Sequence, residues 1–314
     1  MNTFGNNLRI TIYGESHGSG VGVIIDGVPA GILLRDEDFM PDILRRKAGK
    51  KDTTSRIEDD IPKLISGIYE DFTTGAPINI FFENKNVKSK DYTQFKNHPR
   101  PGHADYTATV KYKGYNDIRG GGHFSGRLTL GLVVAGVIAK KIIFKELKDI
   151  EIKSKIVKLG KLKLNDSYGG IIETRIIGLP AGIGEPFFNS LESQIAHIVF
   201  AIPGIKGIEF GAGFEGCVNL SGSEFNDLII DKSGKTDKNN NAGINGGISN
   251  GNEIYFRVAV KPTASIGKIQ NTYNFKTNKI EPLEIGGRHD KAFILRVPVV
   301  VEAVTAIVLA DFIL

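Results

Sequence analysis

Histidine, arginine and aspartate recur in glycine-rich segments of the chain, which is where its side chains could do chemistry. The six segments are 14–18, 100–105, 119–127, 245–251, 261–265 and 286–290. Glycine lets the backbone approach a ligand closely, although any single segment of this kind is more often an ordinary turn. Because several of them carry titratable or cationic side chains, we expect these segments to form one binding site.

The segment 119–127, with the sequence RGGGHFSGR, has the features of an anion site. It precedes an apolar stretch that we expect to be a helix, so its glycines and serine would expose free N–H groups at the positive end of the helix dipole. Arg119 and Arg127 add planar donors suited to phosphate or carboxylate. A second basic cluster surrounds Gly49 and consists of Arg45, Arg46, Lys47, Lys50, Lys51 and Arg56. Alone, such a run is more often a solvated face, but beside histidines in glycine-rich loops a small anionic substrate becomes an equal alternative.

Two histidines lie in glycine-flanked loops, His17 beside Ser16 and His103 near Asp105. Proton-transferring groups are found in such places, but from composition alone a general acid and a structural role are equally favoured. Other chemistries have weaker support. No Gly-x-Ser-x-Gly elbow, phosphate loop or dinucleotide fingerprint is present, and no histidine pair has the spacing of a metal site, so we expect no metal.

Composition narrows the class of protein. Hydrophobic residues make up 41% and charged residues 24%, which is typical of a folded chain. The longest apolar run, 130–139, is well short of the ~18 residues of a spanning helix, so we expect no membrane association. The single cysteine, Cys217, and the absence of a secretory pattern favour a cytoplasmic location.

Nucleic-acid binding is an alternative, because the pI is near 9.0. However, no aromatic stacking pattern accompanies the lysines of 140–163, so we expect no nucleic-acid partner.

Hydrophobic periodicity predicts the elements that must position these loops. Strands are expected at 8–13, 21–28, 64–69, 78–83, 150–164 and 254–260, and helices at 36–47, 125–147, around 189–199 and at 299–314. The segment 125–147 is apolar on nearly every side, which is typical of a helix buried at the centre of a domain. The sequence IIDGVPAGI at 24–32 is similar to IIGLPAGI at 176–183; it is either a common strand-turn motif or the trace of two related halves. No linker divides the chain, so we expect one domain, 1–314.

Taken in order, the motifs resemble those of chorismate synthase. They are NTFG at 2–5, GESHG at 14–18, DGVP at 26–29, TTG at 73–75, SKDY at 89–92, RPGHADY at 100–106, RGGG at 119–122, GGISNG at 246–251, KPT at 261–263 and GRHD at 287–290. The resemblance implies an α+β fold, a β-α-β sandwich with central buried helices between antiparallel sheets, in which the echo above would be an internal pseudo-repeat if it reflects two related halves. It also implies a homotetramer that forms chorismate by anti-1,4-elimination of phosphate from 5-enolpyruvylshikimate-3-phosphate, with reduced FMN as cofactor. A related enzyme acting on another phosphorylated acid is the alternative within this fold.

The resemblance also assigns roles to residues. His17 would protonate the departing phosphate, His103 would sit at the flavin, and Asp290 would assist flavin N5 in taking the C6 proton. The substrate would be bound by Ser16, Arg46, Arg100, Arg127 and Arg288. FMN would lie against His123, Phe124, Ser125, Pro203, Gly204, Gly246, Lys261, Pro262, Thr263, Ala264, Ser265 and Arg288. Arg46 and Lys51 match positions that would contact NADP or another anion.

The chain departs from the family pattern at three of these flavin positions. His123 and Phe124 stand where the family commonly has arginine and serine, and Ala264 stands where serine is usual. Each change alters or removes a hydrogen-bond donor. None of them affects His17, His103 or Asp290.

Overall fold

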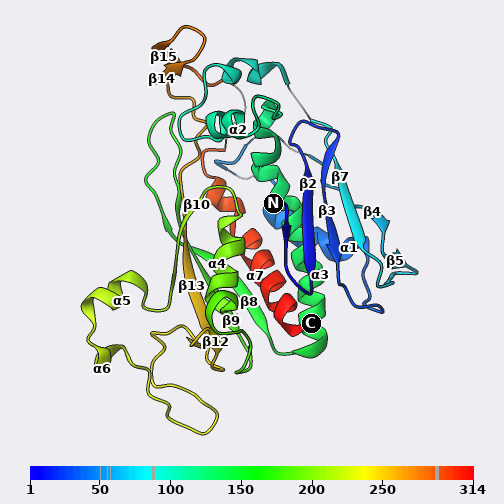
Figure 1. Cartoon of the computed structure of the whole chain (residues 1–314), viewed down its shortest axis with the longest axis vertical. Helices are drawn as coiled ribbons and strands as arrows, with labels where there is room; N and C mark the ends of the chain where they lie inside the picture. Colours follow the sequence, from blue (N-terminus) through cyan, green and yellow to red (C-terminus); the bar gives the residue numbers. More distant parts are fainter. Residues whose placement is uncertain (50, 55, 57, 87–88, 287–289) are drawn as a thin grey trace.

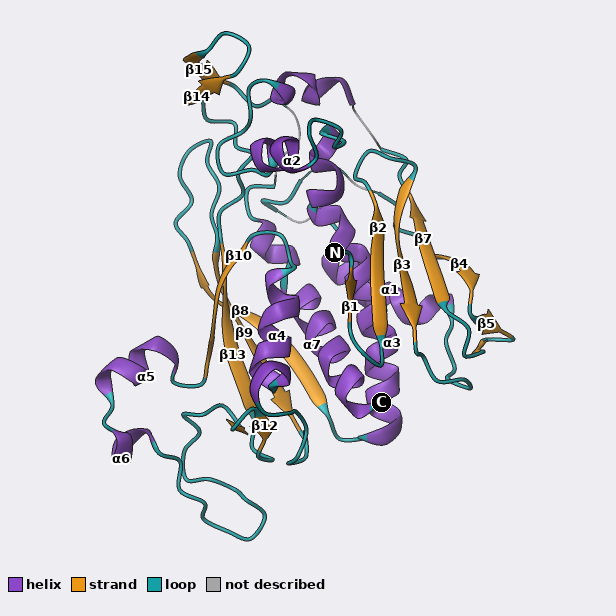
Figure 2. Cartoon of the chain, viewed as in Figure 1, coloured by secondary structure: helices purple, strands orange, loops and turns teal. Residues whose placement is uncertain are grey.

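The chain forms two antiparallel sheets with helices packed between them (Figures 1 and 2). The computed structural model describes residues 1–314 except 50, 55, 57, 87–88 and 287–289. One sheet has the order β1 (Thr3–Phe4), β2 (Arg9–Gly14), β3 (Gly20–Asp26), β7 (Ile78–Glu83), β4 (Lys63–Ser66). The other has the order β10 (Ile205–Phe210), β13 (Ile254–Val260), β9 (Gly170–Ile177), β8 (Glu151–Leu159). The α+β sandwich expected from the sequence is therefore confirmed.

Four helices fill the space between the sheets: α1 (Asp36–Arg46), α3 (Thr129–Glu146), α4 (Leu191–Phe200) and α7 (Pro298–Ile313). Smaller elements lie outside the two main sheets. They are the pairs β5 (Ile68–Tyr69) with β6 (Phe72–Thr73), β11 (Ile244–Asn245) with β12 (Ile248–Ser249), and β14 (Gln270–Asn274) with β15 (Lys279–Leu283), and the helices α2 (Asp105–Lys111), α5 (Gly213–Asn219) and α6 (Gly222–Phe225). Among the described residues, no helix combines the length and the apolar character needed to cross a membrane.

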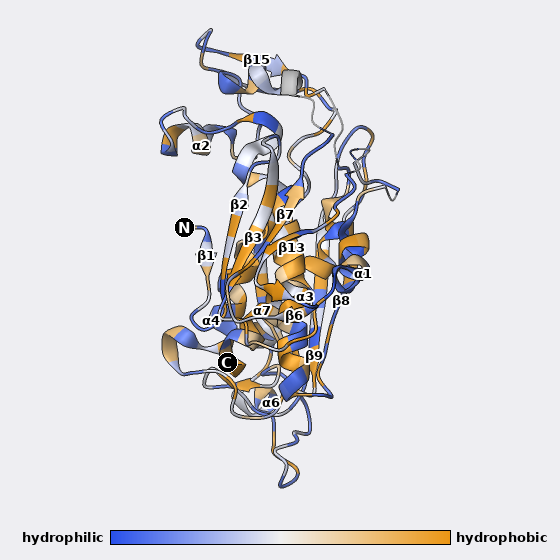
Figure 3. Ribbon diagram, turned by 90° about the vertical axis from the view of Figure 1, so that its right-hand side faces the viewer, coloured by the Kyte–Doolittle hydropathy of each residue, from blue (hydrophilic) through white to orange (hydrophobic). Residues whose placement is uncertain are grey.

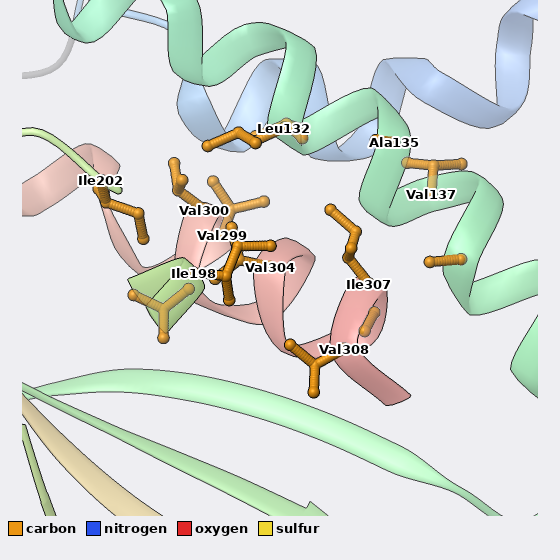
Figure 4. Packing of buried hydrophobic residues seen from close by; sticks show 14 of the residues in the cluster. Leu132, Ala135, Val137, Ile198, Ile202, Val299, Val300, Val304, Ile307 and Val308 are labelled. Atoms are coloured by element: carbon orange, nitrogen blue, oxygen red, sulfur yellow. The ribbon is translucent and has the colours of Figure 1, made fainter. Parts of the chain in front are cut away.

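The core is built around α3 and α7, which are buried over most of their lengths. Figure 3 shows hydrophobic residues concentrated in this middle layer, and Figure 4 shows side chains of α7 interleaved with Leu132 of α3 and with Ile198 of α4. The two helices cross closely at Gly136, where an added Cβ would lie 2.4 Å from the Cβ of Ala303. Burial on all sides explains why these two segments read as uniformly apolar in the sequence.

The two halves of the chain repeat one topology. In the first half, β2, β3, β4 and β7 are ordered β2-β3-β7-β4, with α1 after the second strand and α3 at the end. In the second half, β8, β9, β10 and β13 are ordered β8-β9-β13-β10, with α4 after the second strand and α7 at the end. Of the two interpretations of the sequence echo, the structure supports two related halves.

A repeated hydrogen-bond motif holds the echoed segments in place. Thr73 donates from its Oγ1 to the carbonyl of Pro29 and accepts from the N–H of Ile32. Ser249 makes the same two contacts through its Oγ, to the carbonyl of Pro180 and from the N–H of Ile183. The PAGI sequences at 29–32 and 180–183 thus each turn the chain from a strand toward a helix, clamped by a hydroxyl from a distant residue.

The boundaries of several predicted elements differ in the structure. The predicted strand 150–164 ends at Leu159, and the predicted strand 64–69 divides into β4 and β5, which belong to different sheets. The helix expected from 125 starts at Thr129, because a 3-10 turn, Gly126–Leu128, precedes it. The strands β9 and β10 and the hairpin of β14 and β15 were not among the predicted strands.

Candidate active site

A cavity of about 660 Å³ lies where the N-terminal ends of α3 and α7 meet. Five of the six glycine-rich segments line it, and they bring together parts of the chain that are far apart in the sequence (Figure 1). Among the described lining residues are seven Arg and Lys side chains and three carboxylates, which leaves an excess of four positive charges. The cations are Arg46, Lys47, Arg56, Arg100, Arg127, Lys261 and Arg296. Such a cavity attracts a small polyanion.

A turn of three glycines separates the two predicted catalytic histidines. Gly120, Gly121 and Gly122 all have positive φ, at 61°, 82° and 52°. A Cβ at Gly120 would lie 2.5 Å from Cδ2 of His17, and one at Gly121 would lie 3.5 Å from Nε2 of His103. The positive φ favours glycine at all three positions, and at Gly120 the ring of His17 also leaves no room for a side chain. His17 is 6% exposed and packs edge-on against Tyr92, which itself lines the cavity.

His103 belongs to a charged cluster with Arg100 and Asp105. Its Nδ1 lies 2.7 Å from Oδ1 of Asp105, and Arg100 donates from Nε and Nη2 to the same carboxylate, both at 2.8 Å. Burial opposes ionisation of Asp105, but the hydrogen bonds and charges of Arg100 and His103 outweigh it and hold the pKa of Asp105 well below its ordinary value. An ionised Asp105 keeps a proton on Nδ1 of His103, so its Nε2 is the nitrogen available to the cavity.

Arg46 and Arg127 converge on Asp60, and all three residues line the cavity. Arg127 donates from Nη1 to Oδ1 of Asp60 at 2.8 Å, and Nη1 of Arg46 lies 3.7 Å from Oδ2. Arg46 also donates from Nε to Thr129 at 2.9 Å. Burial and the nearby Arg296 and Arg127 lower the pKa of Arg46 to about 9, which leaves it charged at neutral pH.

Asp290 is held from two sides at the edge of the cavity. It accepts from the N–H of Thr54 at 2.7 Å and from Nη1 of Arg296 at 3.0 Å. Arg296 in turn donates from Nε to the carbonyl of Arg46 at 2.9 Å. The carboxylate of Asp290 and the backbone of Arg46 are thereby fixed relative to each other.

Segment 261–265 forms another part of the cavity lining, together with Pro203 and Gly204. Lys261 donates from its N–H to the carbonyl of Gly204 at 2.9 Å and from Nζ to the carbonyl of Gly102. Ser265 accepts from Nη1 of Arg100 at 3.0 Å. Within the described part of the chain, the buried Oγ1 of Thr263 has no hydrogen-bond partner, which is uncommon for a buried polar atom and leaves it available to a ligand.

Most of the predicted cofactor residues share this cavity. Those that line it are His123, Phe124, Ser125, Pro203, Gly204, Lys261, Pro262, Thr263, Ala264 and Ser265. His123 lies with Nδ1 at 3.0 Å from the carbonyl of Gly14 and Nε2 at 3.0 Å from Oδ1 of Asn2, so in this chain it braces the cavity wall. Of the predicted substrate residues, Ser16, Arg46, Arg100 and Arg127 line the cavity.

Three predicted residues that the structure describes, His17, Gly246 and Lys51, are not among the lining residues of the cavity, although His17 packs against Gly120, which does line it. Gly246 lies in the turn between β11 and β12 and is not among the described lining residues of this cavity, so its predicted flavin contact stays a prediction. It is absent from the lining because of its position: the neighbouring Gly247 accepts from the N–H of Leu191 at the start of α4, whereas Ala201, beyond the end of α4, lines the cavity. Lys51 is exposed and also lies outside the described lining. Arg288 falls outside the described residues.

The structure adds residues that the sequence did not single out as site residues. Arg56, Glu58, Asp60, Thr54, Tyr92 and Arg296 all line the cavity. Arg56 belongs to the basic cluster around Gly49, which is a weak signal. Asp60 has φ +53°, a strained conformation for a residue other than glycine, but nothing in its sequence neighbourhood announces this.

Comparison with known proteins agrees with this geometry. A sequence model of the chorismate synthase family matches residues 8–165 and 161–314. A chorismate synthase from Chitinophaga pinensis is 55% identical over an alignment that covers 100% of this chain and 97% of that protein. One from Pyrococcus abyssi is 41% identical, over 99% of this chain and 97% of that protein.

A solved structure shares the fold. A crystal structure of chorismate synthase superposes with a TM-score of 0.74 at 24% identity, covering 98% of this chain and 92% of that one. Since the family match and the relatives extend over nearly the whole sequence, we conclude that this chain belongs to the chorismate synthase family.

Proposed function

We propose that the protein converts 5-enolpyruvylshikimate-3-phosphate to chorismate by anti-1,4-elimination of phosphate, with reduced FMN as cofactor. The observation that supports this most strongly is the shared cavity, in which Arg100, Arg127, His103 and Asp290 face one space. The substrate has two carboxylates and a phosphate, about four negative charges, and the lining has an excess of four positive charges. Charge complementarity of this kind favours a polyanion over a neutral sugar or a nucleobase.

Departure of phosphate requires a proton donor beside the leaving group. We assign this role to His17, whose ring is buried between Tyr92 and the Gly120 turn. Ser16, Arg46, Arg100 and Arg127 bind the substrate anions. Hydrogen bonds to neighbouring groups, such as those of Arg100 to Asp105 and of Arg127 to Asp60, orient them before the substrate arrives. Preorganised cations stabilise the charge that develops on the departing phosphate.

The elimination also requires that the substrate lose its proton at C6. We propose that Asp290, whose two carboxylate oxygens are fixed by Thr54 and Arg296, assists N5 of the bound flavin in taking this proton. His103 is held at Nδ1 by Asp105 and lines the cavity together with the proposed flavin residues. These positions match the separate tasks of acid and base.

The cavity fits a flavin mononucleotide. Its volume of about 660 Å³ lies within the range usual for ligand and cofactor sites. The unpartnered Oγ1 of Thr263, the hydroxyl of Ser265 and the ammonium of Lys261 supply polar groups on one wall, while Phe124 and Phe293 supply aromatic surface. When bound, reduced FMN supplies electron density to the substrate as phosphate leaves and recovers it as the C6 hydrogen is removed.

An anaerobic assay tests the proposal. Enzyme, 5-enolpyruvylshikimate-3-phosphate and dithionite-reduced FMN should give chorismate, followed by its ultraviolet absorbance, whereas oxidised FMN should give none. Absence of chorismate with reduced FMN would contradict the proposal. Related phosphorylated acids in the same assay, with phosphate release as the readout, test the substrate assignment.

We also propose a cytoplasmic homotetramer that depends on externally reduced FMN, with Arg46 and Lys51 as contacts for NADP or another anion. Exposed apolar side chains support self-association: Phe187, Phe188 and Phe214 are 85%, 92% and 75% exposed. Light scattering coupled to size exclusion gives the mass directly. A monomer at micromolar concentration would rule out the tetramer.

A further inference from the structure

Arg56 makes contacts that the proposed roles of the site residues leave unexplained. Its guanidinium donates from Nη1 to Oγ of Ser16 at 2.9 Å and from Nη2 to the carbonyl of the same residue at 3.0 Å. Two parallel hydrogen bonds from one guanidinium to one residue fix both the side chain and the backbone of Ser16. Arg56 lines the cavity, but its side chain is only 17% exposed and faces this loop.

Glu58 binds the other edge of the Arg56 guanidinium group. Nε and Nη2 donate to Oε1 of Glu58 at 3.1 and 2.8 Å. Glu58 is buried, and its carboxylate also accepts from the backbone N–H groups of Lys85 and Asn86. With its donors engaged by Glu58 and Ser16, Arg56 cannot turn freely toward a ligand.

Ser16 connects these contacts to His17. The N–H of Ser16 donates to the carbonyl of Gly122 at 3.1 Å, so the residue is held by the glycine turn on one side and by Arg56 on the other. Ser16 is 1% exposed, and the His17 ring that follows it lies against Gly120. Any movement of the Ser16 backbone therefore moves the imidazole.

We propose that Arg56 is a positioning residue: it acts through Ser16 to keep the imidazole of His17 aligned with the substrate, and Glu58 fixes it in that orientation. This inference rests on the proposed function, since it gives His17 a proton-transfer role. Misplacement of a reacting group by about 1 Å costs on the order of 10²-fold in rate. Arg56 should therefore affect kcat more than the KM for substrate.

The first test compares Arg56→Lys, which keeps the charge but cannot make both bonds to Ser16, with Glu58→Gln, which keeps the shape of the support. We expect kcat of Arg56→Lys to fall on the order of 10²-fold with little change in KM, and that of Glu58→Gln to fall less. Added guanidinium should restore part of the rate of Arg56→Ala. In a Ser16→Ala background the cost of Arg56→Lys should shrink, because the two residues act as one unit. Unchanged kcat, a raised KM alone, or fully additive effects would overturn the inference.

The second test does not require turnover. Hydrogen–deuterium exchange at Cε1 of individual histidines, followed by mass spectrometry, reports the environment of each ring. In Arg56→Lys, exchange at His17 should speed up while exchange at His197 in α4 stays as in the wild type. An unchanged exchange rate at His17 in Arg56→Lys would overturn the positioning role, even if the wild type made chorismate. If the exchange rate at His17 changes but the wild type makes no chorismate, the result contradicts the proposed function and not the positioning role.

Discussion

At the scale of single residues, the site is a set of charged groups that hold one another in position. Asp60 supports Arg127, Asp105 supports Arg100 and His103, and Glu58 supports Arg56. An anion site made only of cations would repel itself before the substrate arrived. Buried carboxylates behind the arginines offset that repulsion and leave the excess of positive charge at the cavity.

Removal of either imidazole tests the proposed proton transfers. His17→Ala and His103→Ala should each lower kcat by ~10²–10⁴, the usual contribution of a positioned acid or base. His197→Ala is the matched control, because that histidine lies in α4, outside the glycine-rich segments that carry His17 and His103. The measurement is chorismate formation with reduced FMN. Full turnover in both variants would remove the two histidines from the reaction.

Acid should weaken the fold through Asp105. Its pKa lies well below the ordinary value in the folded protein, so the unfolded chain binds more protons below about pH 4. The stability that Asp105 contributes is present above that pH and is lost as the pH falls toward the folded pKa. In Asp105→Asn the free energy of unfolding, from urea titrations at pH 7 and at about pH 3, should be lower than that of the wild type at pH 7 and should fall less on acidification. A pH dependence equal to that of the wild type would contradict this.

At the scale of elements, the cavity depends on two helices that run side by side with their N-terminal ends together. The 3-10 turn at Gly126–Leu128 leads into α3, and the one at Phe293–Arg296 leads into α7; both turns contribute lining residues. The positive ends of both helix dipoles therefore face the same space and add to the field of the arginines.

The crossing of these helices leaves no room for a methyl group at Gly136. An added Cβ would lie 2.5 Å from Cα of Ala303, and backbone cannot move aside as a flexible side chain could. Gly136→Ala should lower the free energy of unfolding by about 1–3 kcal/mol despite the better helix propensity of alanine. Gly222→Ala, whose Cβ would meet open space, is the control. Thermal unfolding of both variants is compared with that of the wild type. A Gly136→Ala variant as stable as the wild type would show that the helices can move apart to admit the methyl group.

The sequence was a good guide to elements and motifs whose signal is local. The uniformly apolar segments predicted α3 and α7 at the centre, and the GESHG and RPGHADY motifs identified the loops that carry His17 and His103. Glu58, Asp60 and Arg296 could not be found in this way, because isolated charges acquire their role only from partners brought close by folding. Gly246 shows the opposite case: a motif position expected at the flavin lies away from the cavity of its own chain. Arg288 lies outside the described residues, so its role stays a prediction.

At the scale of the whole molecule, we propose that the two halves form one folding unit, because the hydrophobic core draws residues from β3 and α3 as well as from β9 and α7. Unfolding should then be a single cooperative transition. The chain has no tryptophan and nine tyrosines, so far-ultraviolet circular dichroism and tyrosine fluorescence provide two independent probes. Coincident transitions are expected. Two separated transitions would show that the halves unfold independently.

The matched hydroxyl clamps of Thr73 and Ser249 bear on how such an enzyme could arise. A gene encoding only the strands β2, β3, β4 and β7 with two helices would give a product able to pair with its own copy. Because α3 and α7 hold equivalent places in the two halves, such a pair would pack two copies of one helix together, as α3 and α7 are packed now. Duplication and fusion would then let the two copies diverge, so that one supplies the imidazoles and the other supplies the aspartate. A pair of identical chains could not have changed one copy without changing the other.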